Sequence, residues 1–478
     1  MTRPLWTSSD IALATGGEAT APFEVTGSIS IDTRTLQKGD LFVALKDQRD
    51  GHEFVEAAFK AGAAGALVSR PVPGGPLVQV DDVLDALTQM GIAARVRCGA
   101  HRTAVTGSAG KTSVKEMLAQ IYRAFGPAHW NVKSFNNHWG VPLTLARMPE
   151  ETQRAIFEIG MSTPGEIAPR SQMVRPHTGI VTCIAAAHLQ GLGSVEGIAE
   201  EKSGIFAGLE AGGTIILPAD DVFLDYLSAR ARSFCPTGSV ETFGTSDEAT
   251  ARIAAYETDG RTSEVVVDIV GQRARVTLNA VGAHWAQNVA ASLLAASQAG
   301  LSLKDCAEAL SGYAPPPGRG TSETLVLPDI GEITLIDDAY NANPASMRAA
   351  LKALAQRSGA RRLVALGDMR EIGDTSAAEH RALAAPVAEA GVDGIFLVGA
   401  EMQHLSQALP RDLQQISAPT ADELWNQLQK ALRAGDVLLI KGSNASGMGK
   451  LADRLRQWSV PAGSGKMDGG PEGAARVN

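Results

Sequence analysis

A run of small residues followed by a lysine and a threonine stands in the first third of the chain, in TGSAGKTSVKEML at residues 106–118. Glycines in such a turn let backbone N–H groups approach an anion closely, and a helix start favours negative charge. Lys111 supplies a cation for nucleotide phosphates, and the Thr112 hydroxyl can bind magnesium. The stretch is therefore predicted to bind a nucleoside triphosphate. The alternative is a plain turn between a strand and a helix.

The residues around this turn support the prediction only in part. Val105 stands where the phosphate-loop pattern has its first glycine, so the match is incomplete. Beyond the turn, apolar residues recur at helical spacing and predict an amphipathic helix with one buried face. These residues are Val114, Met117, Leu118, Ile121, Tyr122 and Phe125.

Two other predicted strands end in residues that could serve phosphate chemistry, because ligands bind at the carboxyl edge of an open α/β sheet. In AIFEIG, Glu158 interrupts an apolar run, where a carboxylate is costly unless it is paired or bound to a metal. A magnesium ligand is favoured here over a buried ion pair. In GIVTCIAAAHLQ, His188 follows a strand, and a structural hydrogen bond is the alternative to metal binding.

Lys202 lies on the apolar stripe of a predicted helix, in VEGIAEEKSGIFAGL. Ile198 and Phe206 flank it at a spacing of four, and Ile205 and Leu209 continue the stripe. Such a lysine usually extends its amino group to water. Where it cannot, loss of hydration lowers its pKa and leaves a neutral, nucleophilic amine. That amine could react with carbon dioxide to form a carbamate, which would turn a cation into a carboxylate-like metal ligand.

The composition is that of a globular protein with several domains, since the 478 residues are 44% hydrophobic and 20% charged. There are 43 Lys and Arg against 52 Asp and Glu and no long basic run, so no nucleic-acid partner is expected. No apolar run could cross a bilayer, and no signal-peptide core is present, which predicts a cytoplasmic protein without membrane insertion. The four separated cysteines predict neither a zinc site nor disulfides.

Breaks in the pattern divide the chain into three domains and a tail. Residues 1–100 mix short strands with Ala/Gly-rich helices, and residues 101–314 contain the phosphate-loop candidate. In the second of these, EVVVDIVGQRARVTL predicts a hairpin with its turn at Gly271 and Gln272. The prolines of YAPPPGRG end that domain, and residues 315–458 alternate strands and helices, which predicts a doubly wound parallel sheet. Residues 459–478 are expected to be disordered.

Six motifs, taken in order, resemble those of the Mur ligases of peptidoglycan synthesis. They are TGSAGKT, SFNNHWGVPLTL, FEIGMSTPGEI, AAAHLQGLGSVEGIAEEKSGIF, DDAYNANPASM and ALGDMREIGD, and the resemblance extends from about Asp32 to the last helix. It implies a three-domain α/β architecture. An amino-terminal UDP-sugar-binding domain precedes a central P-loop ATPase domain and a carboxyl-terminal, doubly wound Rossmann-like domain.

The resemblance also implies the cofactors and the residues that hold them. Thr112 and Glu158 resemble the ligands of one Mg²⁺, and His188 and a carbamylated Lys202 resemble those of a second. The implied catalytic residues are Lys111, Glu158, His188 and Lys202. Asn288 resembles an adenine contact, and Arg319 resembles a nucleotide contact. The implied ATP contacts are Thr106, Gly107, Ser108, Ala109, Gly110, Lys111, Thr112, Asn288 and Arg319.

The implied substrates follow from the motif YNANP, which stands where a diaminopimelate-adding relative would carry DNPR. The chain then resembles the branch that joins D-alanyl-D-alanine to UDP-N-acetylmuramoyl-tripeptide, with ATP first converting the tripeptide carboxylate to an acyl phosphate. It is expected to work as a monomer. The implied substrate contacts are Thr33, Arg34, Asn137, Asp338, Tyr340 and Asn341.

Two other functions stay open at this point. A folylpolyglutamate synthase of the same superfamily would share the central domain, although the DTR and GDLF motifs of the first domain argue against it. A nucleotide-dependent switch or scaffold would bind ATP without ligating anything. In that case Glu158, His188 and Lys202 would have no catalytic use.

Overall fold

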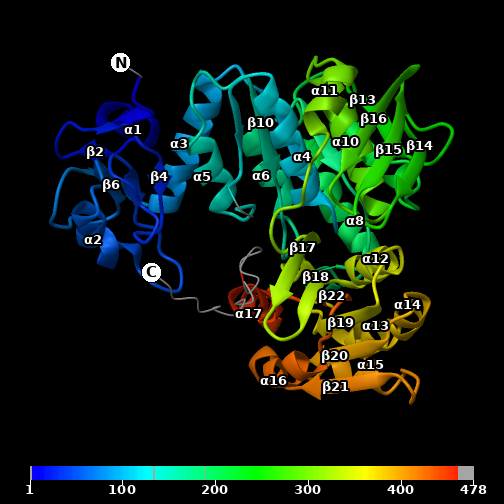
Figure 1. The fold of residues 1–478 in the computed structure, drawn as a ribbon. Helices are drawn as coiled ribbons and strands as arrows, with labels where there is room; N and C mark the ends of the chain where they lie inside the picture. The colour runs from blue at the N-terminus through cyan, green and yellow to red at the C-terminus, as the bar shows by residue number, and fades with distance from the viewer. Residues whose placement is uncertain (1–2, 133–134, 188, 461–478) are drawn as a thin grey trace, which may run out of the picture. The chain divides into compact units, whose positions relative to one another are not determined.

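The computed structural model describes residues 3–132, 135–187 and 189–460, which form two compact units. The first unit runs to Tyr313, apart from Thr258–Thr262 and Asn279–Gly282. The second combines these two segments with the chain from Ala314 onward. The main division thus falls inside the proline-rich stretch at the end of the predicted second domain. Figure 1 shows the helices and strands of both units.

A small five-stranded sheet opens the first unit, in the order β2-β7-β6-β5-β4. Successive side chains of β5 point to opposite faces, so Leu41 and Val43 pack with α1 and α3, whereas Phe42 packs with α2. The bounds are β1 (Trp6–Thr7), β2 (Glu18–Ala19), β3 (Glu24–Val25), β4 (Ile29–Ser30), β5 (Leu41–Val43), β6 (Gly65–Val68), β7 (Leu77–Gln79), α1 (Ser8–Thr15), α2 (Val55–Lys60) and α3 (Val83–Arg97).

A nine-stranded sheet forms the rest of the first unit, in the order β16-β15-β14-β13-β12-β11-β8-β10-β9. Strand β8 lies between β10 and β11 and is parallel to both, so the three segments that follow them leave at one edge. The bounds are β8 (His101–Thr106), β9 (Ala128–Trp130), β10 (Arg154–Glu158), β11 (Thr178–Val181), β12 (Thr214–Pro218), β13 (Ser239–Gly244), β14 (Ala251–Thr258), β15 (Ser263–Ile269) and β16 (Gln272–Leu278).

The predicted hairpin of this sheet is confirmed, with β15 and β16 antiparallel. Its turn lies one residue earlier than expected. Val270 and Gly271 have φ values of 46° and 77°, and a two-residue turn with both φ values positive matches the right-handed twist of the strands.

The predicted amphipathic helix is α4 (Lys111–Ala124), which starts directly after the glycine-rich turn. Its apolar face is buried as expected from Val114 to Tyr122, whereas Phe125 lies just past the helix end and is half-buried. The helix packs beside α10 (His284–Gln298) (Figure 1). The other helices of this part are α5 (Gly140–Ala146), α6 (Ile167–Val174), α7 (Leu189–Leu192), α8 (Val195–Ser203), α9 (Leu224–Phe234) and α11 (Leu303–Leu310).

The helix that carries Lys202 is shorter than predicted. It ends at Ser203, and the chain continues as a 3₁₀ turn over Gly204–Gly208. This turn packs against α6 so closely that a Cβ at Gly208 would overlap the backbone of Ser171. Only glycine, which has no Cβ, allows two backbone segments to come this close. The 3₁₀ turn therefore stands where the apolar stripe predicted that the α-helix would continue.

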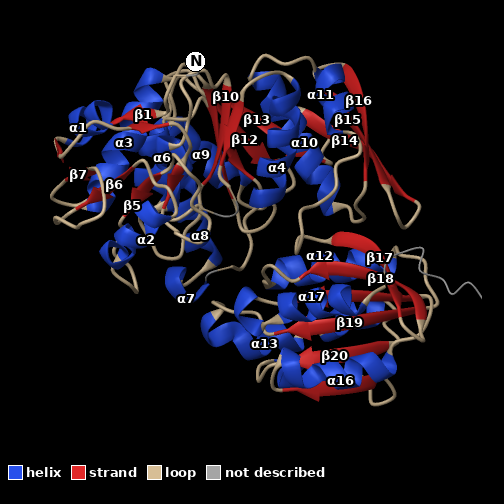
Figure 2. Ribbon diagram, turned by 60° about the vertical axis from the view of Figure 1, so that its left-hand side comes forward, coloured by secondary structure: helices blue, strands red, loops and turns tan. Residues whose placement is uncertain are grey.

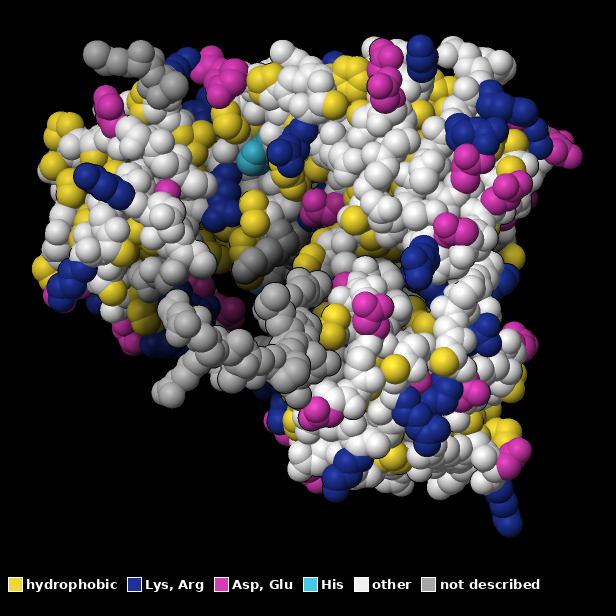
Figure 3. All heavy atoms as spheres, viewed as in Figure 1, with side chains coloured by type: hydrophobic (Ala, Val, Ile, Leu, Met, Phe, Trp, Pro, Cys, Tyr) yellow, Lys and Arg dark blue, Asp and Glu magenta, His cyan; other side chains and the backbone are white. Residues whose placement is uncertain are grey.

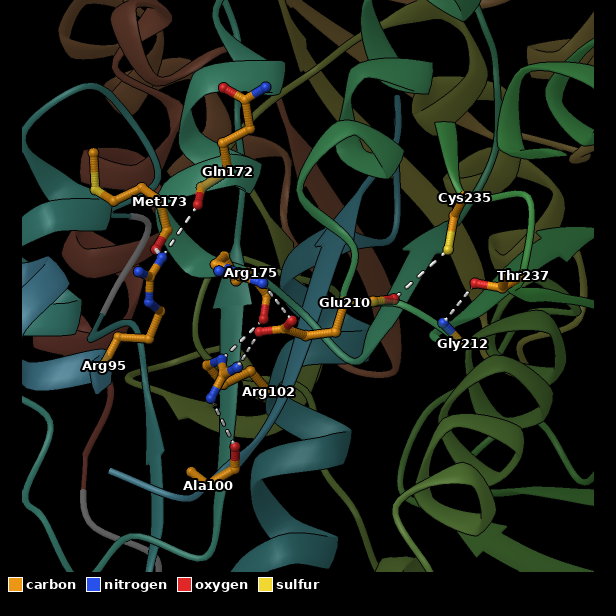
Figure 4. Close-up of polar contacts among 10 residues, drawn as sticks. All are labelled: Arg95, Ala100, Arg102, Gln172, Met173, Arg175, Glu210, Gly212, Cys235 and Thr237. Atoms are coloured by element: carbon orange, nitrogen blue, oxygen red, sulfur yellow. Dashed lines mark hydrogen bonds and ion pairs between the residues drawn. The ribbon is translucent and has the colours of Figure 1, made fainter. Parts of the chain in front are cut away.

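Charged side chains anchor the amino ends of the central strands, at the edge opposite the glycine-rich turn (Figure 4). Arg102 of β8 contacts Glu210 at 3.0 Å, and Glu210 also contacts Arg175 at 2.7 Å. Arg95 of α3 donates to the Met173 carbonyl at 2.6 Å. These contacts connect strand β8, which leads into the glycine-rich turn, to the segment before β12 that carries Glu210. They also connect α3 to α6.

The second unit contains a six-stranded sheet in the order β17-β18-β22-β19-β20-β21. Five strands are parallel, in agreement with the predicted doubly wound sheet, and β17 is an antiparallel edge strand. The two edge strands β17 and β21 were not predicted from the sequence. The bounds are β17 (Thr321–Leu327), β18 (Gly331–Asp338), β19 (Arg361–Gly367), β20 (Gly394–Val398), β21 (Gln414–Ala418) and β22 (Asp436–Lys441).

Helices cover both faces of this sheet (Figure 2). Helices α16 and α17 share one apolar cluster with alternate strand residues such as Leu335 and Leu438. Helix α12 begins at Pro344, a residue well suited to a helix start, behind an Asn343 capping box. The bounds are α12 (Pro344–Ala355), α13 (Ser376–Arg381), α14 (Ala384–Glu389), α15 (Met402–Ser406), α16 (Ala421–Ala431) and α17 (Met448–Trp458).

Charges of both signs are interspersed on the face shown in Figure 3, where neither Lys and Arg nor Asp and Glu form a continuous field. Among the described helices, none is both long enough and apolar enough to cross a membrane.

Candidate active site

The glycine-rich turn connects the end of β8 to the start of α4, as a phosphate-binding loop must. Gly107 and Gly110 have φ values of 149° and 82°, which side chains rarely adopt. A Cβ at Gly107 would overlap Thr182 of the neighbouring strand end, and one at Gly110 would come within 2.7 Å of Asn288 Oδ1. The two glycines are therefore required by conformation and by space, which favours a cradle over an ordinary turn.

Contacts to the segment after β11 hold this loop in place. Ser108 donates its backbone N–H to the Cys183 carbonyl at 2.9 Å and its hydroxyl to the Ala185 carbonyl at 2.9 Å. Lys111 lies across the loop and donates to the Gly107 carbonyl at 2.6 Å. The cation is thus held over the turn, and the start of α4 directs its backbone N–H groups to the same place.

Thr112 and Glu158 come together although they are 46 residues apart. The Thr112 hydroxyl donates to Glu158 Oε2 at 3.0 Å, and Asn136 donates its side-chain amide to Oε1 at 2.8 Å. Glu158 is the last residue of β10 and only 1% exposed. The two residues predicted to share a magnesium ion therefore lie side by side.

A buried cation near Glu158 was missed in the sequence. Lys115 is fully buried on α4, and its ammonium lies 2.8 Å from the Glu116 carboxylate and 4.0 Å from Glu158. It also donates to the Asn131 carbonyl at 3.0 Å. The carboxylate therefore has an ion partner at 4.0 Å, as the alternative of a buried ion pair requires, and magnesium binding by Glu158 stays a prediction. The only signal was a lysine four residues after Lys111.

Lys202 is buried, as predicted, with 1% of its surface exposed. Its amino group lies 4.0 Å from the Sδ of Met161, just beyond the strand that ends in Glu158. Burial lowers the pKa of Lys202 well below its usual value, and the nearby charge of Lys111 lowers it further. Both effects favour the neutral form of the amine.

The other two residues predicted to bind the nucleotide or a metal in this unit are Asn288 and His188. Asn288, on α10, is 7% exposed and lies against Gly110, so it borders the loop. His188 lies outside the described residues. Within the described part of the chain, no three His, Cys, Asp or Glu side chains gather as a metal-binding group.

The predicted substrate contacts of the first unit lie in two places. Thr33 and Arg34 follow β4, where Arg34 forms an ion pair of 2.6 Å with Asp32 that raises the pKa of the guanidinium. Asn137 accepts a hydrogen bond from the Gly140 N–H at 2.9 Å and so supports the start of α5. Its neighbour Asn136, rather than Asn137, contacts Glu158.

The remaining predicted residues belong to the second unit. Arg319 lies over the ring of Tyr340, 3.8 Å from its centroid. Asp338 ends β18, where burial raises the pKa of its carboxyl while an ion pair with Lys441 at 2.7 Å opposes that rise. Asn341 follows in the same loop. The structure thus brings these four residues to one edge of the second sheet.

Comparisons with known proteins identify the family. The model of the Mur ligase middle domain matches residues 105–296, and that of the Mur ligase glutamate ligase domain matches residues 324–444. A relative in Escherichia coli strain K12, named UDP-N-acetylmuramoyl-tripeptide--D-alanyl-D-alanine ligase, is 34% identical over 90% of this chain and 94% of its own length. The chain belongs to the Mur ligase family.

Other similar proteins span nearly all of this Mur ligase. An identically named relative in Bacillus subtilis strain 168 is 33% identical over 87% of this chain and 90% of its own length. A crystal structure of MurF from Acinetobacter baumannii superposes with a TM-score of 0.82 at 30% identity, covering 95% and 99% of the two chains. The match to the middle domain begins at Val105 and contains the phosphate-binding loop, Glu158, Lys202 and Asn288.

Proposed function

We propose that the protein is an ATP-dependent ligase that joins D-alanyl-D-alanine to UDP-N-acetylmuramoyl-tripeptide in peptidoglycan precursor synthesis. The observation that carries the proposal is the hydrogen bond between Thr112 and Glu158, next to the loop that Lys111 spans. The buried Lys202 is near enough to Lys111 for that charge to lower its pKa. The names and coverage of the relatives give the substrates. A nucleotide switch would need the loop but not the buried carboxylate and the neutral lysine.

The reaction must overcome the resistance of a carboxylate to attack by an amine. ATP transfers its γ-phosphoryl group to the terminal carboxylate of the tripeptide, which gives ADP and an acyl phosphate. The dipeptide amine then attacks the acyl carbon and loses a proton. The bond between the acyl carbon and the bridging oxygen breaks, which releases phosphate and leaves the amide. The protein contributes mainly position and charge stabilisation to such a transfer.

The loop residues provide most of that contribution. The backbone of residues 106–110 and the ammonium of Lys111 would bind the phosphates, and Asn288 would border the nucleoside. Thr112 and Glu158 fit a magnesium ion, because a hydroxyl and a carboxylate already point toward each other at 3.0 Å. Bound magnesium would neutralise negative charge on the phosphates and the substrate carboxylate.

Lys202 is proposed to act as a carbamate. Its neutral amine would attack the carbon of carbon dioxide and lose a proton, so that an anion replaces a buried amine. The low pKa of Lys202 and the neighbouring charge of Lys111 support this, since an anion would be attracted where a cation is repelled. With His188, it would hold a second magnesium ion.

The proposal assigns one task to each domain. Residues 1–100 would bind the UDP-sugar through Thr33 and Arg34, and residues 101–314 would bind ATP. Residues 315–458 would bind the dipeptide with Asp338, Tyr340 and Asn341, while Arg319 would contact the nucleotide. Asn137 would border the tripeptide.

Product analysis tests the proposal. The purified protein is incubated with ATP, Mg²⁺, UDP-N-acetylmuramoyl-tripeptide and D-alanyl-D-alanine, and the products are measured by mass spectrometry. We expect a UDP-pentapeptide, with one ADP and one phosphate per product, that disappears when any component is omitted. Glutamate in place of the dipeptide serves as the control amine. Hydrolysis of ATP without any ligated product would contradict the proposal.

A further inference from the structure

The carboxyl edge of the second sheet contains a buried cation that the proposed function does not use. Lys441 is the last residue of β22 and only 2% exposed. Its ammonium donates to the Asp338 carboxylate at 2.7 Å and to the Asn341 carbonyl at 3.0 Å, and it lies 3.5 Å from the Asp338 carbonyl. One side chain of β22 thus fixes both ends of the segment 338–341, which follows β18.

The position of this contact in the sheet is that of a ligand site. Strands β18 and β22 are parallel neighbours. The chain leaves β18 for α12, whereas it leaves β22 for α17, which packs in the apolar cluster on one face of the sheet. Buried residues of α12, such as Met347 and Leu351, are not in that cluster. Where neighbouring connections leave for opposite faces, a crevice opens at the carboxyl edge, and ligands bind there.

The groups around the crevice suit a small polar ligand. Tyr340 follows Asp338 and is 38% exposed, with Arg319 against its ring at 3.8 Å. On the loop after β22, the Ser443 hydroxyl is buried and has no hydrogen-bond partner among the described residues. A buried hydroxyl without a partner is costly, so a ligand that completes its hydrogen bond would be favoured.

Taken with the proposed function, these contacts point to one role. We propose that Lys441 is a positioning residue for the amine substrate, which holds the segment 338–341 in the conformation that binds the dipeptide. Burial of an ammonium group costs free energy because the group loses its hydration. In this position the cation holds a carboxylate and a loop carbonyl in a fixed geometry. Without it, Asp338 would lose its partner and turn toward water.

The test compares Lys441→Gln with Arg361→Gln. Arg361 pairs with Asp436, the first residue of the same strand, at 2.7 Å, so its replacement removes an ion pair from the other end of β22. For Lys441→Gln we expect the KM for D-alanyl-D-alanine to rise at least about tenfold, while the KM values for ATP and the UDP-tripeptide stay within about twofold. Hydrogen exchange should become faster at residues 339–342. Arg361→Gln should change none of these values.

Each outcome decides the inference. An unchanged KM for the dipeptide in folded Lys441→Gln would overturn it. If that variant does not fold, Lys441→Arg is measured, whose planar head cannot reproduce the three contacts, and the same selective rise in KM is expected. Failure of both to fold, while Arg361→Gln folds, would assign Lys441 to fold stability and also overturn the inference. Wild-type protein that makes no product with the dipeptide would refute the proposed function instead.

Discussion

The hydroxyl of Thr112 and the carboxylate of Glu158 are joined by a hydrogen bond of 3.0 Å, which links the first turn of α4 to the end of β10. Neither residue would be unusual alone. Together they place a hydroxyl and a carboxylate at the end of the phosphate-binding loop, where magnesium binding is proposed, and Asn136 fixes the second carboxylate oxygen at 2.8 Å. This pair connects nucleotide binding to the chemistry, because a metal held there would contact the phosphates that the loop binds.

Removal of the Thr112 hydroxyl should impair catalysis more than folding. Thr112→Val keeps the shape of the side chain, and we expect ligase turnover to fall at least about tenfold with a higher Mg²⁺ requirement. Thr144→Val is the matched control, since Thr144 is also buried but donates only to the Gly140 carbonyl of its own helix, at 2.8 Å. Equal activity of the two variants over a magnesium titration would contradict the role of Thr112.

Lys202→Ala should nearly abolish ligation, because the anion required by the proposal is lost. Short carboxylic acids such as acetate or propionate should restore part of the activity by occupying the place of the carbamate. Sodium chloride at the same ionic strength and acetamide are the controls and should restore nothing. Ligation at the wild-type rate by Lys202→Ala, without any added acid, would show that Lys202 is not required.

Gly107→Ala should destroy ATP binding. The added Cβ would overlap Thr182, and a positive φ is unfavourable for alanine, so the loop must deform. Gly271→Ala is the control, because Gly271 also has a positive φ but a Cβ there meets open space. We expect both variants to lose about 1 kcal/mol of unfolding free energy or more. Only Gly107→Ala should lose nucleotide affinity in calorimetry, and retained affinity would mean that the loop is not the ATP site.

Acid should destabilise the protein through His129, whose pKa burial lowers from 6.5 to about 4. Above pH 6.5 the histidine is neutral in the folded and unfolded chains, so it contributes nothing. As the pH falls toward 4, the unfolded chain binds a proton that the folded chain excludes, and stability falls by on the order of 1–3 kcal/mol.

His129→Gln tests this origin, since glutamine can still donate to the Thr144 carbonyl that His129 Nε2 contacts at 2.7 Å. Denaturant unfolding at pH 7.5 and pH 4.5 should show a smaller loss of stability on acidification in the variant. An identical loss in both proteins would exclude His129 as a source. His101, whose pKa burial also lowers to about 4, would remain as a separate contribution.

The sequence predicted those parts of the fold that local patterns determine. The helix after Thr112, the hairpin near Gly271 and the alternating strands and helices of the second unit all follow from periodicity and turn residues. The antiparallel strand β17 and the early end of α8 were not predicted. The first depends on pairing with β18, and the second on the backbone contact between Gly208 and α6, so neither has a local signal.

The site could be predicted as a set of residues but not as a network. Burial of Lys202 followed from its place on an apolar stripe, and the geometry confirms that burial. Lys115, Asn136 and Lys441 were missed because each has a partner in the site that is distant in sequence, and a lysine or an asparagine is common on any surface. Their importance becomes visible only when strand ends from different parts of the chain meet at one edge.

The most direct test of the central claim follows an oxygen atom. UDP-N-acetylmuramoyl-tripeptide labelled with ¹⁸O in its terminal carboxylate is incubated with the protein, ATP, Mg²⁺ and D-alanyl-D-alanine, and the released phosphate is examined by mass spectrometry. An acyl phosphate carries one carboxylate oxygen into the phosphate, so one ¹⁸O per molecule of UDP-pentapeptide is predicted. Pentapeptide formed with unlabelled phosphate, or labelled tripeptide left unreacted while ATP is consumed, would contradict the account.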